Sequence, residues 1–586
     1  MTDNKIYNSI ISREPIAKGL SGDKKYCVKT ADGGQLLLRV SSILELDNKK
    51  AEYGMMERVY ALGVSTSQPV EFGICDGGKN CYSLSSWLDG EDAEKALSHM
   101  SESEQYVLGL KAGETLRKIH IQPAPESIAD WSERYFTVID ERIDAYHTKG
   151  VPFEGREIIL NYLKQNRDLL RGRPQCFIHG DYHEGNLMVN ANGELYVIDL
   201  LDEGFGNYGD PWYDFKTFGE YEIETFGEKE NVYFITGFVR GYFDGEPPQE
   251  FWDILTYYIV TEGLTSIVWM KYRQPEKLPN SISWNERNAQ SIKEGHSPLM
   301  KWYLKDFYIQ WTDGIPYKLK APFDFSFLSK YGKVFKVFDE QGSGNISFGV
   351  QDGTKRRFVK FAGAPMPNYI ANRDSGAIDA AKAIEFLKAA VPLYTELAHP
   401  TLIKFVSAEE IDGGYAVVFE WEDAIGIEPK DSPDYMRFMQ MPVEKKIRAF
   451  EDIVEFHAHV AAKGYIALDF YDGSILYDYE KDKVIICDID LYQKSPFINA
   501  DGLGIVGSAR YVSPEECVND AIMDEITNVY TMGATAFALF AYGDRSPEAW
   551  TLPPELFAVV KRAVSDERDD RQQSIVQFIS EWRLVK

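Results

Sequence analysis

The sequence is poor in cysteine and contains no long apolar run. Its 586 residues include six cysteines, with no CxxC pair and no regular spacing, so we expect no disulfide framework. The first residues, MTDNKIYNSI, lack the apolar core of a signal peptide, and no run approaches the ~20 apolar residues that cross a bilayer. We therefore expect a cytoplasmic protein with no membrane partner.

Basic residues are also scarce. The chain has 63 lysines and arginines against 91 aspartates and glutamates, which gives a net charge of -28. An acidic surface repels nucleic acid and anionic membranes but is compatible with small cationic molecules. Charge that serves solubility alone would look the same. We expect no nucleic-acid partner, and a cationic small molecule stays open as a ligand.

The remaining composition is that of a globular protein. Hydrophobic residues make up 44% of the chain and aromatic residues 13%. The length exceeds that of one common domain, so we expect two or three domains, each with its own core.

The order of predicted elements occurs twice along the chain. Residues 11–40 alternate β-prone runs with Gly-rich turns, residues 100–175 have helical apolar spacing, and an acidic motif follows. The same order returns after residue 330, and the first aspartates of the two motifs, Asp181 and Asp469, lie 288 residues apart. A period this long indicates a duplicated or fused domain, because solenoid repeats span ~20–50 residues. We predict two domains, 1–318 and 319–586, joined near the proline-containing stretch GIPYKLKAPFDF.

The first acidic motif is FIHGDYHEGNLMVNANGELYVIDLLDE, residues 177–203, in which acidic side chains stand between strand-like runs. Phosphoryl transfer needs phosphates held in line, their charge neutralised by Mg²⁺, and a base that orients the accepting hydroxyl. Asp181 is suited to the base role. Asn186 and Asp199 can supply oxygen ligands to magnesium, since Mg²⁺ prefers such ligands.

These residues resemble the aminoglycoside phosphotransferase family. The shared pattern is H-G-D-x-x-x-x-N followed by I-D, together with GDPWYDF at residues 209–215 and LSSWLDGED at residues 84–92, and the resemblance covers roughly residues 10–310. It implies an α+β, protein-kinase-like fold with a small β-rich lobe and a larger helical lobe. It also implies ATP or GTP as phosphate donor, Mg²⁺ as cofactor, and a small molecule with a hydroxyl group as acceptor.

The same resemblance places the rest of the nucleotide site. Gly19, Ser21 and Gly22 would form the turn over the phosphates, although a plain hairpin turn has the same sequence pattern. The strand that carries the family's phosphate-pairing lysine reads QLLLRVS, so this role falls on Arg39, with Glu52 as its helix partner. Arginine keeps the charge but offers a planar fork where lysine offers a point charge.

Other interpretations of the motif remain. His179, Asp181 and His183 could ligate zinc, but no further His or Cys cluster nearby completes four ligands, and His179 is better explained as a structural histidine. Asp202 and Asp210 could contact a cationic substrate or cap turns. The acidic run at 219–230 is typical of a solvated face, with an amine-binding rim as the alternative.

The second half resembles eukaryotic-type serine/threonine protein kinases, through HPTLI at 399–403, GSARYVSPEE at 507–516 and DERDDRQQSI near the end. Position by position, the resemblance implies a glycine loop at Gly342 and Gly344, a phosphate-pairing lysine at Lys360 and a base at Asp469. It implies Ser474 and Asp488 as the two metal ligands.

Several positions of the second half depart from the kinase pattern. This chain has ALD where the family has HRD, and DID where the family has DFG. Ser474 replaces the metal-binding asparagine, and Ser347 replaces the third glycine of the loop. Asn528 replaces a buried aspartate, and Glu385 lies further from HP than the helix glutamate should. These departures imply slow activity or a pseudokinase.

We therefore expect a Mg²⁺-dependent phosphotransferase acting on a hydroxyl of a small polar or cationic molecule. The second domain would regulate it, act weakly on protein, or bind a protein partner. Two alternatives remain: a nucleotide-sensing regulatory scaffold, and a protein serine/threonine kinase in which the first half is accessory.

Overall fold

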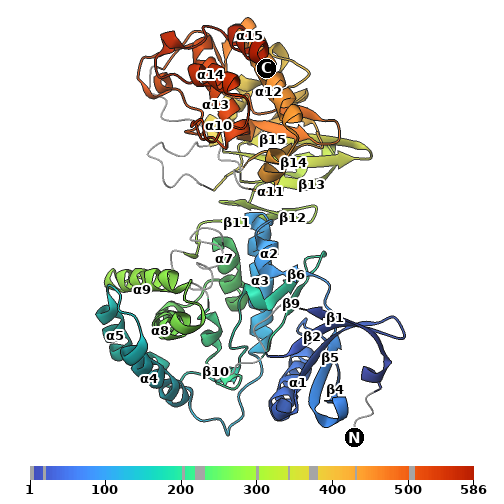
Figure 1. The fold of residues 1–586 in the computed structure, drawn as a ribbon, viewed down its shortest axis with the longest axis vertical. Coiled ribbons are helices and arrows are strands. Elements are labelled where there is room, and N and C mark those ends of the chain that lie inside the picture. The colour runs from blue at the N-terminus through green and yellow to red at the C-terminus, as the bar shows by residue number, and fades with distance from the viewer. Residues whose placement is uncertain are drawn as a thin grey trace. The chain divides into compact units, whose positions relative to one another are not determined.

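The computed structural model divides the chain into two compact units, Met1–Lys305 and Asp306–Lys586. Each is described here by itself (Figure 1). The structure describes residues 5–16, 22–200, 205–217, 231–298, 302–340, 344–367, 380–428, 432–499 and 508–586. None of the helices in these ranges is long and apolar enough to span a bilayer.

The first unit begins with a five-stranded antiparallel sheet in the order β1-β2-β3-β5-β4. Its strands are β1 (Ile10–Ile16), β2 (Lys24–Thr30), β3 (Gln35–Ser42), β4 (Pro69–Cys75) and β5 (Asn80–Ser86). One face of the sheet buries Val28, Leu38 and Leu84 completely. Helix α1 (Leu46–Ala61) connects β3 to β4 and is followed by Gly63, whose φ of 72° is readily adopted by glycine.

A mostly helical part follows the sheet. Its helices are α2 (Ala93–Leu97), α3 (Glu102–Ile119), α4 (Trp131–Lys149), α5 (Arg156–Gln165), α7 (Val232–Phe243), α8 (Gln249–Arg273) and α9 (Leu278–Lys293). Helix α3 starts with a capping box in which Ser101 and Glu104 each bond the other's backbone N–H.

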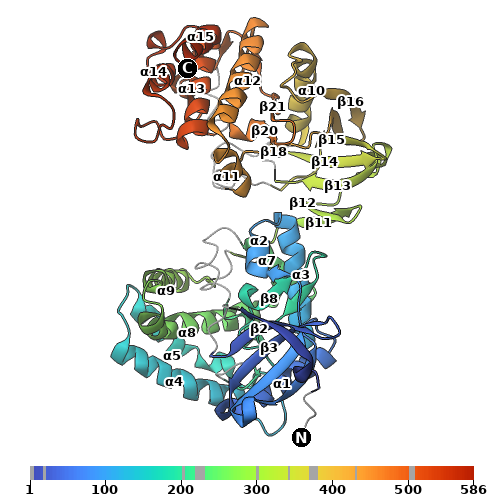
Figure 2. The same ribbon diagram turned by 45° about the vertical axis from the view of Figure 1, so that its right-hand side comes forward.

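Helices α3 and α7 run side by side in both views (Figure 1, Figure 2). Glycines at four-residue spacing face each other along this contact, Gly109 and Gly113 on α3 and Gly237 and Gly241 on α7. A Cβ atom at any of them would clash with the backbone of the other helix. The glycines therefore allow the two helix backbones to touch.

Short strands carry the acidic motif between these helices. A three-stranded sheet has the order β6-β8-β9, and β7 pairs with β10. Their bounds are β6 (Glu91–Asp92), β7 (Cys176–Phe177), β8 (Leu187–Val189), β9 (Leu195–Val197) and β10 (Tyr208–Gly209).

The second unit repeats this plan. Its five-stranded antiparallel sheet has the order β13-β14-β15-β17-β16, in which each strand takes the place of its counterpart in the first sheet. The strands are β13 (Lys333–Phe338), β14 (Asn345–Asp352), β15 (Lys355–Ala362), β16 (Phe405–Ile411) and β17 (Gly414–Glu420). Helix α10 (Ala380–Glu396) lies between β15 and β16 in the chain, as α1 lies between β3 and β4.

The helical part of the second unit contains α11 (Pro433–Met439), α12 (Val443–Ala462), α13 (Glu525–Ala541), α14 (Pro554–Ala563) and α15 (Ile575–Val585). Its short strands are β18 (Ile425–Gly426), β19 (Tyr465–Ile466), β20 (Ile475–Asp478), β21 (Lys483–Ile486), β22 (Gln493–Lys494), β23 (Phe497–Ile498) and β24 (Ile522–Met523).

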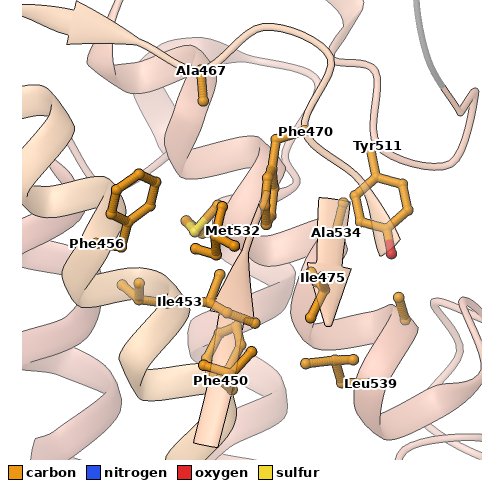
Figure 3. Close-up of a cluster of buried hydrophobic side chains, with 14 of the residues drawn as sticks. Phe450, Ile453, Phe456, Ala467, Phe470, Ile475, Tyr511, Met532, Ala534 and Leu539 are labelled. Atoms are coloured by element: carbon orange, nitrogen blue, oxygen red, sulfur yellow. The ribbon is translucent and has the colours of Figure 1, made fainter. Parts of the chain in front are cut away.

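The core of this helical part lies beneath the second acidic motif. Phe450, Ile453 and Phe456 of α12 pack with Phe470 and with Met532 of α13, all at most 2% exposed (Figure 3). Phe470, which belongs to the motif, is thus held by apolar contacts with this core.

The division of the chain lies earlier than the predicted 318/319 boundary. The hairpin β11 (Tyr308–Thr312) and β12 (Ile315–Leu319) belongs to the second unit. Tyr317 is fully buried, with its ring 5.6 Å from that of Phe325 and 5.8 Å from that of Phe348. Pro316 lies in this two-stranded hairpin, where a proline is tolerated, so it does not mark a linker.

Candidate active site

Local strand pairing brings the predicted magnesium ligands of the first unit together. Asn186 ends a short 3₁₀ turn directly before β8, and Asp199 follows β9 by two residues. Leu187 pairs with Val197 across the two strands, and the Ile198 N–H donates to the Asn186 carbonyl at 3.0 Å. The strands form because their apolar residues are buried, with Leu187 and Val197 fully inside.

The base candidate, Asp181, lies in the loop just before this turn. Asn186 Nδ2 donates to the Asp181 carbonyl oxygen at 2.8 Å and to Asp181 Oδ2 at 3.0 Å. His183 Nε2 lies 3.5 Å from the same carboxylate. Partial burial raises the pKa of Asp181, but the hydrogen bond and charge of His183, with Lys216 and His179, outweigh it and hold the pKa well below its usual range. Asp181 is therefore ionised at neutral pH.

The donor set fits a magnesium ion. Asp199 is exposed and has φ = 60°, an uncommon backbone conformation that aspartate tolerates better than most residues. Within the described ranges, Asp199 makes no hydrogen bond and the Asn186 Oδ1 atom accepts none. Two hard oxygen ligands plus substrate phosphates and water are a usual magnesium environment.

A buried aspartate anchors the loop that holds Asp181. Asp214 accepts the His179 N–H at 2.7 Å and the Gly180 N–H at 2.5 Å, and His120 Nε2 lies 2.9 Å away. Lys216, 8% exposed, donates to the Gly180 carbonyl. Both sides of the Gly180 peptide are therefore held, which fixes the direction of the next residue, Asp181.

His179 is a structural histidine, as the sequence favoured over zinc. It is fully buried, its Nε2 lies 3.1 Å from the Ile198 carbonyl, and its Nδ1 accepts the Asp181 N–H at 3.3 Å. Both ring nitrogens are thus engaged. In the part of the chain that the structure describes, no cluster of His, Cys, Asp and Glu could hold a metal such as zinc by itself.

Asp210 takes the second of its two predicted roles. It is fully buried, receives Arg173 at 2.8 and 3.1 Å and Tyr258 at 2.8 Å, and caps the turn at Trp212. It is thus engaged in the fold, away from solvent. Asp202, the acidic run 219–230, Gly19 and Ser21 all lie outside the described residues.

The predicted pair of Arg39 with Glu52 is replaced by a longer network. Arg39 bonds Asp23 at 3.0 Å, Lys49 bonds Asp23 at 3.0 Å, and Lys49 bonds Glu52 at 2.7 Å. No hydrogen bond between Arg39 and Glu52 occurs among the described residues. The reason is Asp23, just after Gly22: its carboxylate lies between the two cations and is 5% exposed. Sequence spacing gave no signal for this residue.

In the second unit, the predicted phosphate-pairing lysine contacts the predicted metal ligand. Lys360 Nζ bonds Asp488 at 2.7 Å and Asp490 at 2.6 Å, and Tyr394 of α10 donates to Asp490 at 2.7 Å. Glu385 of α10 is not part of this contact. Asp490, the last residue of DID, thus occupies the place expected for a helix glutamate.

The second motif differs from the first around its base. Burial and the nearby Asp488 raise the pKa of Asp469 to about 7. Asp469 Oδ1 and the Ser474 hydroxyl are buried without a hydrogen-bond partner in the described structure. Asn528 bonds both the N–H and the carbonyl of Ala467 at 2.8 Å. Gly344 has φ = 75°, which suits a glycine turn, while Gly342 lies outside the described residues.

Comparison with known proteins supports the enzyme class. The model of the family described as "Phosphotransferase enzyme family" matches residues 12–252, which include Asp181, Asn186 and Asp199. The match indicates a phosphotransferase. No curated protein matches the chain.

Solved kinase structures are similar at low identity. The kinase of Cydia pomonella granulovirus has 12% identity and a TM-score of 0.34, covering 44% of this chain and 96% of its own. An amicoumacin kinase has 13% identity and a TM-score of 0.36, covering 48% and 89%. An aminoglycoside-3'-phosphotransferase of type VIII has 17% identity and a TM-score of 0.30, covering 43% and 93%.

Proposed function

We propose that the first unit transfers the γ-phosphate of ATP or GTP to a hydroxyl group of a small polar or cationic molecule, in a Mg²⁺-dependent reaction. The observation that carries this proposal is the contact of Asp181 with Asn186 at 3.0 Å beside the end of β9, where Asp199 follows. A base and two oxygen ligands meet on one short segment.

The chemistry assigns one role to each residue. The acceptor oxygen forms a bond to the γ-phosphorus, the bridging phosphorus–oxygen bond breaks, and the nucleoside diphosphate leaves. Asp181, ionised, orients the hydroxyl and receives its proton. Asn186 and Asp199 would hold Mg²⁺, which supplies positive charge that offsets the charge of the phosphates. The net charge of -28 supports a polar or cationic acceptor.

We further propose that the second unit is a kinase-like domain that regulates the first or acts weakly on protein. The strand order it shares with the first unit and the contact of Lys360 with Asp488 support nucleotide binding. Ser474 in place of asparagine, and a base whose pKa is raised to about 7 by burial and by Asp488, support slow chemistry. The scaffold and protein-kinase alternatives remain as outcomes of the test below. A cytoplasmic location remains a prediction.

A nucleotide-consumption screen tests the proposal. The full chain is incubated with Mg²⁺ and either ATP or GTP, across amino sugars and small hydroxyl metabolites. Turnover with one acceptor class should fall about 10²–10⁴-fold in Asp181→Asn. The matched variant Asp469→Asn should retain it.

Other outcomes reject the assignment. Equal turnover in Asp181→Asn and the parent would remove the base role from the first unit. Nucleotide binding without turnover on any acceptor would favour the scaffold. Autophosphorylation lost only in Asp469→Asn would favour the protein kinase.

A further inference from the structure

Two cations lie opposite each other in the sheet of the first unit. Lys25 of β2 pairs with Arg39 of β3 in the strand register, so both side chains project from the same face. This face is opposite the one that buries Val28 and Leu38. Lys24, one residue earlier, projects from the other face and is exposed.

In the second unit, the corresponding pair of residues includes a lysine that contacts the predicted metal ligand. There Ser347 of β14 pairs with Lys360 of β15, and the lysine contacts Asp488 at 2.7 Å. Asp488 and Asp199 both follow their strand by two residues and have φ near 60°, at 58° and 60°. The first unit thus has two cations where the second has a serine and a lysine.

Arg39 is committed to another partner. Its guanidinium bonds Asp23 through Nε at 3.2 Å and Nη2 at 3.0 Å, and Asp23 also receives the Ser41 hydroxyl at 2.6 Å. With Lys49 and Glu52, the network contains two cations and two carboxylates, so its charges cancel. Moving Arg39 toward a phosphate would leave the nearly buried Asp23 with one cation fewer, which is costly.

Lys25 has no such commitment. In the described ranges it makes no hydrogen bond or ion pair, and its side chain is half-buried. Burial and the neighbouring Arg39 lower its pKa, and the Asp199 and Asp23 carboxylates oppose them. A half-buried ammonium that projects from the face of the sheet opposite the core suits an anionic phosphate oxygen.

We propose that Lys25 of β2, and not Arg39, pairs with the nucleotide phosphates in the first unit, while Arg39 and Asp23 position the β2–β3 hairpin. This inference rests on the proposed function, because it needs a nucleotide in this unit. It moves the phosphate-binding charge one strand along the sheet, and it gives Arg39 a structural role.

Measurements of nucleotide affinity distinguish the role of Lys25 from that of Arg39. Binding of Mg·AMP-PNP to the full chain is measured by calorimetry in a Lys360→Met background, which removes the lysine of the second unit. Lys25→Met should weaken binding by about tenfold or more, since a charge-assisted hydrogen bond is lost. The matched control Lys24→Met should bind within about twofold, and Lys25→Arg should keep most of the affinity because it keeps the charge. Arg39→Met should lower the melting temperature of the protein and leave its affinity for Mg·AMP-PNP largely unchanged.

A covalent probe gives an independent answer that needs no variant. An acyl phosphate of ATP acylates a lysine close to the bound phosphates, forming an amide and releasing the nucleotide. Mass spectrometry should find Lys25 labelled, and excess Mg·ATP should block the labelling. Labelling at Lys49 in its place, or none at Lys25 in an enzyme that turns over, would overturn the inference.

These experiments distinguish a wrong role for Lys25 from a wrong proposed function. If Asp181→Asn abolishes turnover and Lys25→Met binds nucleotide like its parent, only the role of Lys25 is wrong. If Asp181→Asn leaves turnover unchanged, the proposed function itself is wrong.

Discussion

At the residue scale, the two halves show how neighbours set the charge of equivalent aspartates. Asp181 has a histidine and a buried lysine beside it and stays ionised, whereas the pKa of Asp469 is raised to about 7 by burial and by Asp488. The same residue type at the same motif position therefore has its pKa shifted in opposite directions in the two units. If both aspartates act as proposed, the first unit has the better base.

The buried His457 on α12 makes the free energy of unfolding depend on pH. Burial lowers its pKa to about 4, and its ring nitrogens lie 2.8 Å from the Ile453 carbonyl and 2.9 Å from the Tyr492 hydroxyl. The unfolded chain takes up a proton near pH 6.5, but the folded chain does so only near pH 4. The neutral imidazole therefore contributes stability above pH 6.5 that is lost as the pH falls toward 4, by at most about 3 kcal/mol.

Urea unfolding of the full chain and of His457→Gln at pH 7, 5.5 and 4.5 measures this contribution. The difference in unfolding free energy between the two proteins should shrink as the pH falls. The comparison must be differential, because the raised pKa values of Asp469 and Glu428, each about 7, change stability in the opposite sense. Parallel pH profiles for the two proteins would show that His457 does not carry the effect.

Side-chain partners were predictable only where they are local in sequence. Asn186 lies five residues from Asp181, so the motif alone predicted that both belong to one site, and the structure adds their direct hydrogen bond. The predicted partner of Arg39 was wrong, because Asp23, directly before β2, reaches both Arg39 and Lys49 of α1, a proximity that sequence spacing does not give. The sequence did not predict Asp490 as the partner of Lys360. Asp490 is the third residue of DID, and the third residue of the kinase motif DFG is an uncharged glycine.

At the element scale, the two β-rich parts followed from the sequence, whereas the strand orders and the helix packing did not. Gly-rich turns between β-prone runs predicted both sheets, because a short turn leaves antiparallel pairing as the available connection. The contact between α3 and α7 depends on glycines that lie more than a hundred residues apart in the sequence. Nothing in either helix alone indicates that its glycines meet the other.

Replacing one of these glycines tests the packing. In Gly113→Ala, the new Cβ would clash with the Phe238 carbonyl oxygen, so the helices must separate, at a cost of about 1–3 kcal/mol. The matched control is Gly54→Ala in α1, where a Cβ meets nothing within 4 Å and alanine should stabilise the helix by about 0.5–1 kcal/mol. Thermal unfolding should therefore move in opposite directions for the two variants. Equal melting temperatures would contradict the close packing.

At the scale of the whole molecule, the chain contains one strand order twice, with a different cation arrangement in each copy. The first unit has Lys25 and Arg39 facing each other and Asn186 at the predicted metal position, while the second has Ser347 and Lys360 facing each other and Ser474 at that position. The repeat was visible in the sequence because both acidic motifs keep their spacing. The boundary was less visible, since Pro316 suggested a linker but lies in a hairpin strand.

The central claim is that Asp181, Asn186 and Asp199 serve one metal–nucleotide site in the first unit. Electron paramagnetic resonance of Mn²⁺, used in place of Mg²⁺, tests it on the full chain with AMP-PNP. The background variant Asp488→Asn removes the corresponding carboxylate of the second unit, and Asp168→Asn, an exposed aspartate paired with Arg171, serves as the control.

We predict that Mn²⁺ binds the background protein only with the nucleotide, that Asp199→Asn weakens this binding by about tenfold or more, and that Asp168→Asn does not change it. Unchanged nucleotide-dependent Mn²⁺ binding in Asp199→Asn would contradict the account.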